Sequence, residues 1–348
     1  MASDVIDWDL AISTGALLAP KGPDLDLGDA KGVVRDLRAF ADEAVAPVRE
    51  CTMMVTPSQA PPAAVIDRRG WIESNVEAMR FVLHPILDRM RANGPNGVTA
   101  VGSRVTAVQM GGVLSWLSGK VLGQYEAMVA PGATPRLMLV APNIYSVAEQ
   151  LEVDQRDFQM WVCLHEETHR VQFTAVPWLS DYFATEVRSL VAGVDVPMSD
   201  LLKRYRQITS ALIEIMRGKD GAQAILKAVQ TPQQQEVFDR LTALMTLLEG
   251  HADVVMDEVG PAVVPSVEVI RQRFEVRRKQ PGAFDSVARR LLGMDAKLRQ
   301  YSEGAAFVRA AIDGVGVAGF NRVWESPQTL PSSAEIADPA LWIARTKG

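Results

Sequence analysis

Hydrophobic positions along the chain recur mainly at the three-to-four-residue spacing of amphipathic helices. Residues 32–50 place apolar side chains at 33, 34, 37, 40, 41 and 44, which predicts a helix with one buried face. Similar patterns predict helices over residues 71–92, 103–129, 199–217, 220–229, 232–256, 266–278 and 284–313. Pro85 is expected to interrupt the helix at 71–92, because proline removes a backbone hydrogen bond. The chain is therefore expected to be predominantly helical.

One segment instead has the character of a β-strand. Residues 136–141 are almost entirely apolar and have prolines on both sides. The strand should end at Pro142, and a short helix over residues 144–151 is expected to follow. Asp154 can then cap a further helix that runs to about Phe173.

Composition and charge narrow the classes of function. The 348 residues carry a formal net charge of −6 and have a pI near 5.4, which argues against a nucleic-acid partner. The amino terminus lacks the basic start of a secretory signal, and the most apolar stretch, 98–121, contains charged and polar residues. A cytoplasmic location without membrane association is therefore expected. Cys51 and Cys163 are too few for a disulfide framework, and Cys163 is expected to be a packing residue.

Residues 165–169 read His-Glu-Glu-Thr-His, which is the H-E-x-x-H pattern. Two histidines four residues apart share one face of a helix, so both imidazoles can reach a single Zn²⁺ ion. Glu166 lies beside them, where it can face a metal-bound water and act as a general base. The same stripe of this helix carries apolar residues, which indicates that the histidines point inward: Phe158, Val162 and Phe173.

A catalytic zinc site uses three protein ligands and leaves the fourth position to water. His84 precedes a proline in an ordinary helix, which favours a packing or surface role. Glu249 and Asp253 lie four residues apart in a strongly apolar segment, where a buried carboxylate needs a partner or a metal. We expect Glu249 to be the third ligand and Asp253 to accept a hydrogen bond from a ligand histidine. His251 faces the other side of the helix from Glu249 and is a weaker candidate.

These residues resemble a known pattern of zinc enzymes. H-E-x-x-H followed about eighty residues later by Glu249-x-x-x-Asp253 resembles the gluzincin site, in which the glutamate completes the ligand set and the aspartate orients a histidine. The whole chain is similar to the zincin-like metallopeptidase family of actinobacterial and chloroflexal proteins. The segments that carry this likeness are 7–9, 67–71, 121–125, 161–169, 177–179, 249–253 and 293–301. The resemblance implies a predominantly helical α+β fold, with a small sheet beside the motif helix whose edge strand could bind an extended peptide.

The leading hypothesis for function is zinc-dependent hydrolysis of an amide bond, most simply in a peptide. Zn²⁺ held by His165, His169 and Glu249 would activate a water, and Glu166 would accept its proton. A tetrahedral intermediate also needs a hydrogen-bond donor, and the candidates are His251, Tyr301, Tyr182 and Arg290. Two alternatives stay open: a non-catalytic zincin-like scaffold that binds a partner, and a hydrolase that acts on an amide of a small metabolite.

The chain has no obvious domain boundary. Loops at 51–63 and 126–136 are the best candidates for one. We expect a helical amino-terminal region over residues 1–130 and a zincin-like catalytic region over 131–325. Prolines and serines predict an irregular carboxy-terminal tail over 326–348. The three parts are expected to pack as one compact unit.

Overall fold

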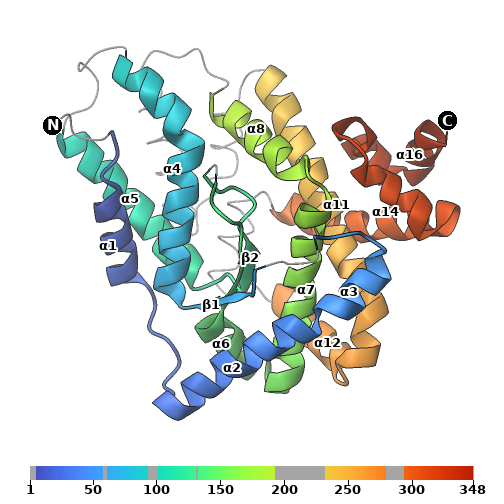
Figure 1. Cartoon of the computed structure of the whole chain (residues 1–348), viewed down its shortest axis with the longest axis horizontal. Helices are drawn as coiled ribbons and strands as arrows, with labels where there is room; N and C mark the ends of the chain where they lie inside the picture. Colours follow the sequence, from blue (N-terminus) through green and yellow to red (C-terminus); the bar gives the residue numbers. More distant parts are fainter. Residues whose placement is uncertain are drawn as a thin grey trace.

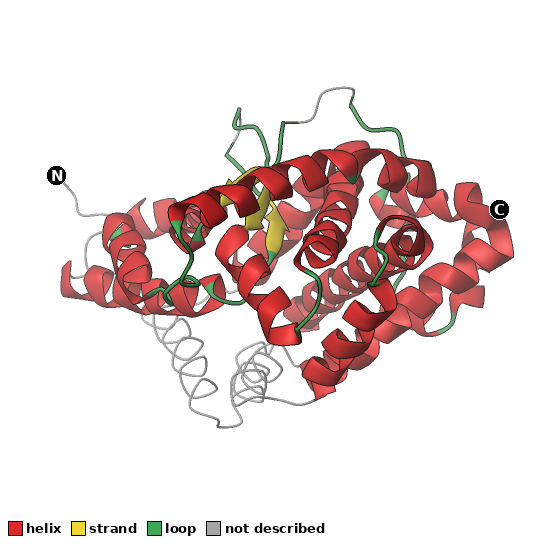
Figure 2. Cartoon of the chain, turned by 90° about the horizontal axis from the view of Figure 1, so that it is seen from below, coloured by secondary structure: helices red, strands yellow, loops and turns green. Residues whose placement is uncertain are grey.

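The computed structural model describes residues 5–57, 61–92, 100–130, 132–192, 232–279 and 294–347. Helices make up most of this part of the chain, and they surround a small three-stranded sheet (Figures 1 and 2). The fold is therefore α+β and predominantly helical, as predicted. The helices predicted at 199–217 and 220–229 lie outside the described residues, as does the start of the helix predicted at 284–313.

The amino-terminal helices are α1 (Trp8–Leu18), α2 (Leu27–Glu43), α3 (Val45–Thr52), α4 (Arg68–Ala92) and α5 (Ala100–Ser118). The single helix predicted over 32–50 is thus divided between α2 and α3. Pro85 lies inside α4 and does not end it, because the proline sits on an exposed side where water can satisfy the unpaired carbonyl. The helix predicted over 103–129 is wrong beyond Ser118, where a turn leads into a strand.

The sheet has three short strands in the order β1, β3, β2. The strands are β1 (Ala64–Ile66), β2 (Gly123–Tyr125) and β3 (Leu137–Val140). The central strand β3 is fully buried and was predicted; it runs parallel to β1 and antiparallel to β2. Gly123 pairs with Leu139 and Tyr125 with Leu137, which makes β2 one edge of the sheet.

Three helices follow the sheet directly: α6 (Ala141–Leu151), α7 (Gln155–Ala175) and α8 (Leu179–Ala192). The predicted cap of α7 is confirmed, because the Asp154 carboxylate accepts a hydrogen bond of 2.9 Å from the backbone N–H of Asp157. α7 contacts α2, α3, α6, α11, β2 and β3, and it lies near the centre of the molecule in Figure 1. The H-E-x-x-H segment is therefore held on a helix that is packed from several sides.

The carboxy-terminal elements are α11 (Pro232–Val263), α12 (Val267–Lys279), α14 (Met294–Phe320), η1 (Asn321–Trp324), η2 (Pro327–Thr329), α15 (Ser333–Ala337) and α16 (Pro339–Thr346). The prediction of an irregular tail over residues 326–348 is wrong, because short capped helices form there. Ser332 caps α15, and Asp338 caps α16. Trp342 of α16 is fully buried and donates a hydrogen bond of 2.8 Å to the carbonyl of Thr329, so the tail packs onto the core.

Two clusters of buried apolar residues form the core. The larger cluster extends from Leu37 in α2 to Trp342 in α16 and includes much of α7 and α11. The smaller one joins α1, α4 and α5 to the other face of the sheet, through Met138 and Val140 of β3. The larger cluster contains residues from all three predicted regions. The boundaries between those regions, near residues 130 and 325, stay predictions. Within the described residues, each helix is too short or too polar to cross a lipid bilayer.

Candidate metal centre

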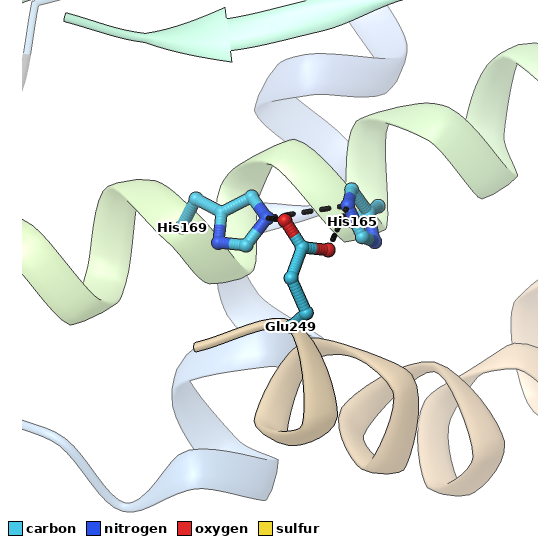
Figure 3. Close-up of side chains that lie close together, drawn as sticks. All are labelled: His165, His169 and Glu249. Carbon is cyan, nitrogen blue, oxygen red and sulfur yellow. Dashed lines mark hydrogen bonds and ion pairs between the residues drawn. The ribbon is translucent and has the colours of Figure 1, made fainter. Parts of the chain in front are cut away.

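Three side chains that could hold a metal ion, from α7 and α11, face one another (Figure 3). The Nε2 atoms of His165 and His169 lie 3.2 Å apart. Glu249 places one carboxylate oxygen 3.6 Å from Nε2 of His165 and the other 3.7 Å from Nε2 of His169. The structure thus brings together the three residues that the sequence predicted as ligands.

This donor set fits a zinc ion. Ligand atoms at about 2.0–2.1 Å from a tetrahedral Zn²⁺ are about 3.3–3.4 Å from each other, which is close to the 3.2 Å between the two Nε2 atoms. Each histidine faces a different oxygen of Glu249, and one ligand atom from each of the three residues lies within 4.8 Å of the others. Two imidazoles and one carboxylate also form a typical ligand set of catalytic zinc sites. Burial alone would lower the pKa of His169, but the carboxylates of Glu249 and Glu166 outweigh burial and raise the pKa. The surroundings therefore favour a positive charge at this point.

The position of Glu249 depends on a close contact between two helices. A Cβ atom on the adjacent Gly250 would lie 2.2 Å from the carbonyl carbon of Gly304 in α14. A Cβ atom on Gly304 would in turn lie 2.3 Å from the carbonyl oxygen of Thr246. Only glycine at both positions lets the backbones of α11 and α14 touch here, which places the ligand-bearing turn of α11 against α14.

Glu166 lies under the edge strand of the sheet. Its carboxyl group is buried against β2, where a Cβ atom on Gly123 would come within 2.5 Å of both Cγ and Cδ of Glu166. The pKa of Glu166 is raised to about 7, mainly by burial and also by the nearby Glu249, against the opposing effect of His169. Glu166 lines the same cavity as the two histidines. The predicted general base thus stands beside the predicted metal ligands.

Gln172 is a residue of this site that the sequence reasoning missed. It is fully buried, and its Oε1 accepts a hydrogen bond of 2.9 Å from Nδ1 of His169. Its Nε2 donates to the carbonyl of Leu248 at 2.9 Å and to Nδ1 of His251 at 3.1 Å. This network selects the tautomer of His169 whose Nε2 lone pair faces the centre. A glutamine on the inward stripe, three residues after a ligand histidine, was the available signal.

The structure places His251 and Asp253 on different sides of α11. His251 is buried behind the metal centre, where its ring packs 5.4 Å from Phe320 and 5.5 Å from Trp324, measured between ring centroids. Burial, reinforced by His169, lowers the pKa of His251 to about 3. This placement does not support the predicted role of His251 as a transition-state donor. Asp253 lines the cavity, and Nδ1 of His169 donates to Gln172, so His169 is not the histidine that Asp253 orients. A hydrogen bond from His165 to Asp253 stays a prediction.

The remaining candidates lie away from the centre or outside the described side chains. His84 is exposed and pairs with Asp88 at 3.0 Å, and Cys163 is fully buried, which confirms its packing role. Tyr182 packs on the ring of Trp178 and is not among the described residues that line the cavity. Two further candidate donors, the Arg290 and Tyr301 side chains, lie outside what the structure describes.

The cavity in front of the metal centre has a volume of about 1860 Å³. Its walls include residues of α4, β2, α7, α8, α11, α12 and α14, together with residues 127–130, 133, 134 and 136. Phe173, Phe183 and Met245 contribute apolar side chains to these walls. The cavity is therefore large enough for a sizeable organic molecule, and the two histidines, Glu249 and the buried Glu166 all line it.

Comparisons with known proteins agree with this geometry. A family model described as zincin-like metallopeptidase matches residues 6–343. The chain is also similar to the protein in a solved structure titled "Crystal structure of a putative hydrolase with a novel fold from Chloroflexus aurantiacus". The identity is 31%, the TM-score is 0.67, and the match covers 98% of this chain and 99% of the other. No curated protein matches the chain.

Proposed function

Because the chain belongs to the zincin-like metallopeptidase family, we propose that it is a zinc-dependent hydrolase that cleaves an amide bond in a peptide. The observation that carries this proposal is the meeting of four side chains in one cavity. His165, His169 and Glu249 offer ligand atoms within 4.8 Å of one another, and Glu166 lines the same space.

Each side chain has a separate task in the proposed reaction. Zinc, when bound by the two histidines and Glu249, supplies a Lewis acid that makes water more acidic and polarises the scissile carbonyl. Glu166 accepts a proton as the water oxygen adds to the carbonyl carbon, and it delivers that proton to the amide nitrogen as the C–N bond breaks. Gln172 keeps His169 in the tautomer that turns Nε2 toward the ligand centre.

A peptide substrate is supported by the edge strand β2. At the two ends of β2, the N–H of Val140 donates to the carbonyl of Leu122, and the N–H of Glu126 donates to the carbonyl of Arg136. In an antiparallel pair, every second residue is bonded to the partner strand in this way, and the residues between them direct their N–H and C=O groups away from it. Gly123 therefore presents its backbone groups to the open side of the sheet, beside Glu166. An extended peptide that pairs there would pass close to the metal ligands.

The size of the cavity also favours a peptide over a small metabolite. Pockets that enclose small ligands usually measure about 300–1,000 Å³, whereas the cavity here measures about 1860 Å³. Its contributors are spread from α4 to α14, so several residues of an extended chain can be accommodated. The proposed partner is accordingly a peptide, with no role for nucleic acid or membrane.

The test combines metal analysis with peptide cleavage. We expect purified protein to hold about one zinc per chain by elemental analysis and to cleave members of a broad peptide library. A chelator should abolish cleavage, and added zinc should restore it. Glu166→Gln should retain the zinc and lose turnover, whereas Glu249→Ala should lose the zinc.

Three outcomes would contradict the proposal in different ways. Stoichiometric zinc in Glu249→Ala would exclude that residue as a ligand. Substantial turnover by Glu166→Gln would exclude it as the base. Zinc binding and peptide binding without any cleavage by the wild type would indicate a binding scaffold in place of an enzyme.

A further inference from the structure

We propose that Arg271 and Arg309 form a binding site for a carboxylate group of the substrate, in the same cavity as the metal centre. This inference rests on the proposed function, because it assigns a chemical preference to the same cavity. Both arginines and the aspartate between them, Asp257, line the cavity wall. They come from α12, α14 and α11 respectively.

The arginines are held in place by one shared carboxylate. Asp257 forms an ion pair with Nη2 of Arg271 through one oxygen and with Nη2 of Arg309 through the other. Two positive charges and one negative charge leave this group with a net charge of +1. The start of α12 is also fixed, because Asp157 of α7 accepts hydrogen bonds of 2.8 and 2.6 Å from the backbone and hydroxyl of Ser266. The two guanidinium groups are thus positioned before any ligand arrives.

The guanidinium groups keep donors available for a ligand. Each arginine has five N–H donors in a planar fork that matches a carboxylate, and each pairs with Asp257 through Nη2. The side chains of Arg271 and Arg309 are 30% and 50% exposed. They can therefore contact Asp257 and a second carboxylate at the same time, and this second contact would offset the net positive charge.

The distance from the metal centre matches a peptide. Asp257 lies eight residues after Glu249, two turns along the same face of α11, with Asp253 between them. Eight residues of helix span about 12 Å, and an extended peptide covers that distance with about three to four residues. A carboxylate bound by the arginines would thus belong to a residue about three or four positions from the scissile bond.

Charges of both signs lie at the far side of the cavity. Glu73 and Glu77 of α4 lie there, on the other side of β2 from α11 (Figure 1), and they pair with Arg69 and Arg80. At Asp257, by contrast, two arginines share one carboxylate, so a carboxylate of the substrate is attracted to the wall formed by α12 and α14. The carboxylate can come from the carboxy terminus of a peptide or from an aspartate or glutamate side chain.

The test measures peptide binding to the zinc-loaded Glu166→Gln protein, so that slow cleavage does not interfere. The probes are heptapeptide mixtures randomised over uncharged residues and labelled at the amino terminus with tetramethylrhodamine, and binding is followed by fluorescence anisotropy. One mixture ends in a free carboxylate, a second ends in an amide, and a third is amidated and contains one glutamate. We expect at least one carboxylate-bearing mixture to bind about tenfold more tightly than the uncharged amide. The mixture that shows the preference identifies the source of the carboxylate.

Substitutions then assign the preference to the two arginines. Arg309→Gln and Arg271→Gln should each remove most of it, and Arg309→Lys should retain part of it because the charge remains. Arg240→Gln is the matched control, since Arg240 is 46% exposed and pairs with Glu186 away from the cavity. It should leave the preference unchanged. Thermal unfolding of each variant checks that the fold is intact.

Several results would overturn the assignment. These are equal binding of the three mixtures, no binding of any, a preference that survives both glutamine variants, or an equal loss in Arg240→Gln. The proposed function is tested separately, by measuring whether the zinc-loaded wild-type protein cleaves the same mixtures. A carboxylate preference without cleavage would leave the arginine site standing and would contradict the hydrolase.

Discussion

Replacement of Gly123 by alanine should separate catalysis from metal binding and from stability. The added methyl group would lie 2.5 Å from Cγ and Cδ of Glu166 and 2.8 Å from its Oε1. Carbon atoms in contact normally lie about 3.5–4.0 Å apart, so one partner must move by about 1 Å. The end of the Glu166 side chain can move more easily than a strand that is paired with β3.

The expected effect is large for turnover and small for the fold. A displacement of about 1 Å at a reacting group can lower the rate by about 100-fold, so kcat should fall by about that factor. Zinc content should stay at the wild-type value, because the three atoms nearest to the added methyl group all belong to Glu166, which is not one of the three proposed ligands. The melting temperature should change little, since a terminal side-chain rotation relieves the contact.

The assay follows kcat, KM and zinc content for the peptide that the wild type cleaves best. A fall in kcat with little change in KM would assign the loss to the displaced base and not to weaker peptide pairing with β2. Gly112→Ala is the matched control, because a Cβ atom there would meet nothing within 4 Å. A kcat of Gly123→Ala within about threefold of the wild type would refute the reasoning, since it falls far short of the expected effect.

Three further predictions concern the environment of the site and the packing of the fold. Gln172→Leu should weaken zinc affinity by about 10- to 100-fold while Gln172→Glu retains most of it, and equal zinc dissociation constants for the two variants would contradict the orienting role. Gly111→Ala should destabilise the protein by about 1–3 kcal/mol, because its Cβ atom would lie 2.6 Å from a backbone oxygen of α1. Gly112→Ala should be neutral or up to about 1 kcal/mol stabilising, and urea unfolding that ranks the two variants alike would be incompatible with this contact. Burial alone would raise the pKa of Glu126, but hydrogen bonds, mainly from Arg136, outweigh it and hold the pKa below its ordinary 4.5. The stabilisation of the fold by the ionised Glu126 should therefore be complete above pH 4.5 and disappear as the pH falls through the lowered pKa. If the free energies of unfolding of wild type and Glu126→Gln differ by the same amount across that pH range, this prediction is contradicted.

The elements that local pattern could predict are those whose signals lie within one segment. The start of α7 follows from Asp154 as an N-cap, and the buried strand β3 follows from an apolar run bounded by prolines. The separation of His165 from His169 follows from helix geometry alone. In each case the neighbours along the chain supply most of the information.

The short strands and short helices could not be predicted in the same way. β1 and β2 have three residues each, which is too few to show a period, and they become strands because β3 pairs with them. The apolar segment that contains β2 therefore had the character of a helix. The tail was expected to be irregular because of its prolines, yet Pro339 occupies the first turn of α16, where proline is compatible with a helix. Burial of Trp342 then fixes that helix on the core.

The residues of the site also differ in whether one segment of the sequence is enough to predict them. Glu249 could be predicted as a ligand because it stands in a strongly apolar stretch of the chain, where a buried carboxylate needs a partner or a metal. The bonds of Gln172 to Leu248 and to His251 depend on how α7 lies against α11, and no local pattern contains that packing. Arg271 and Arg309 are still harder to relate, because they are 38 positions apart and meet only through an aspartate on a third helix. Residues of a site that lie on one helix can thus be related by their spacing in the sequence, whereas residues on different helices can be related only through the fold. The substrate preference proposed for the two arginines depends on contacts of the second kind.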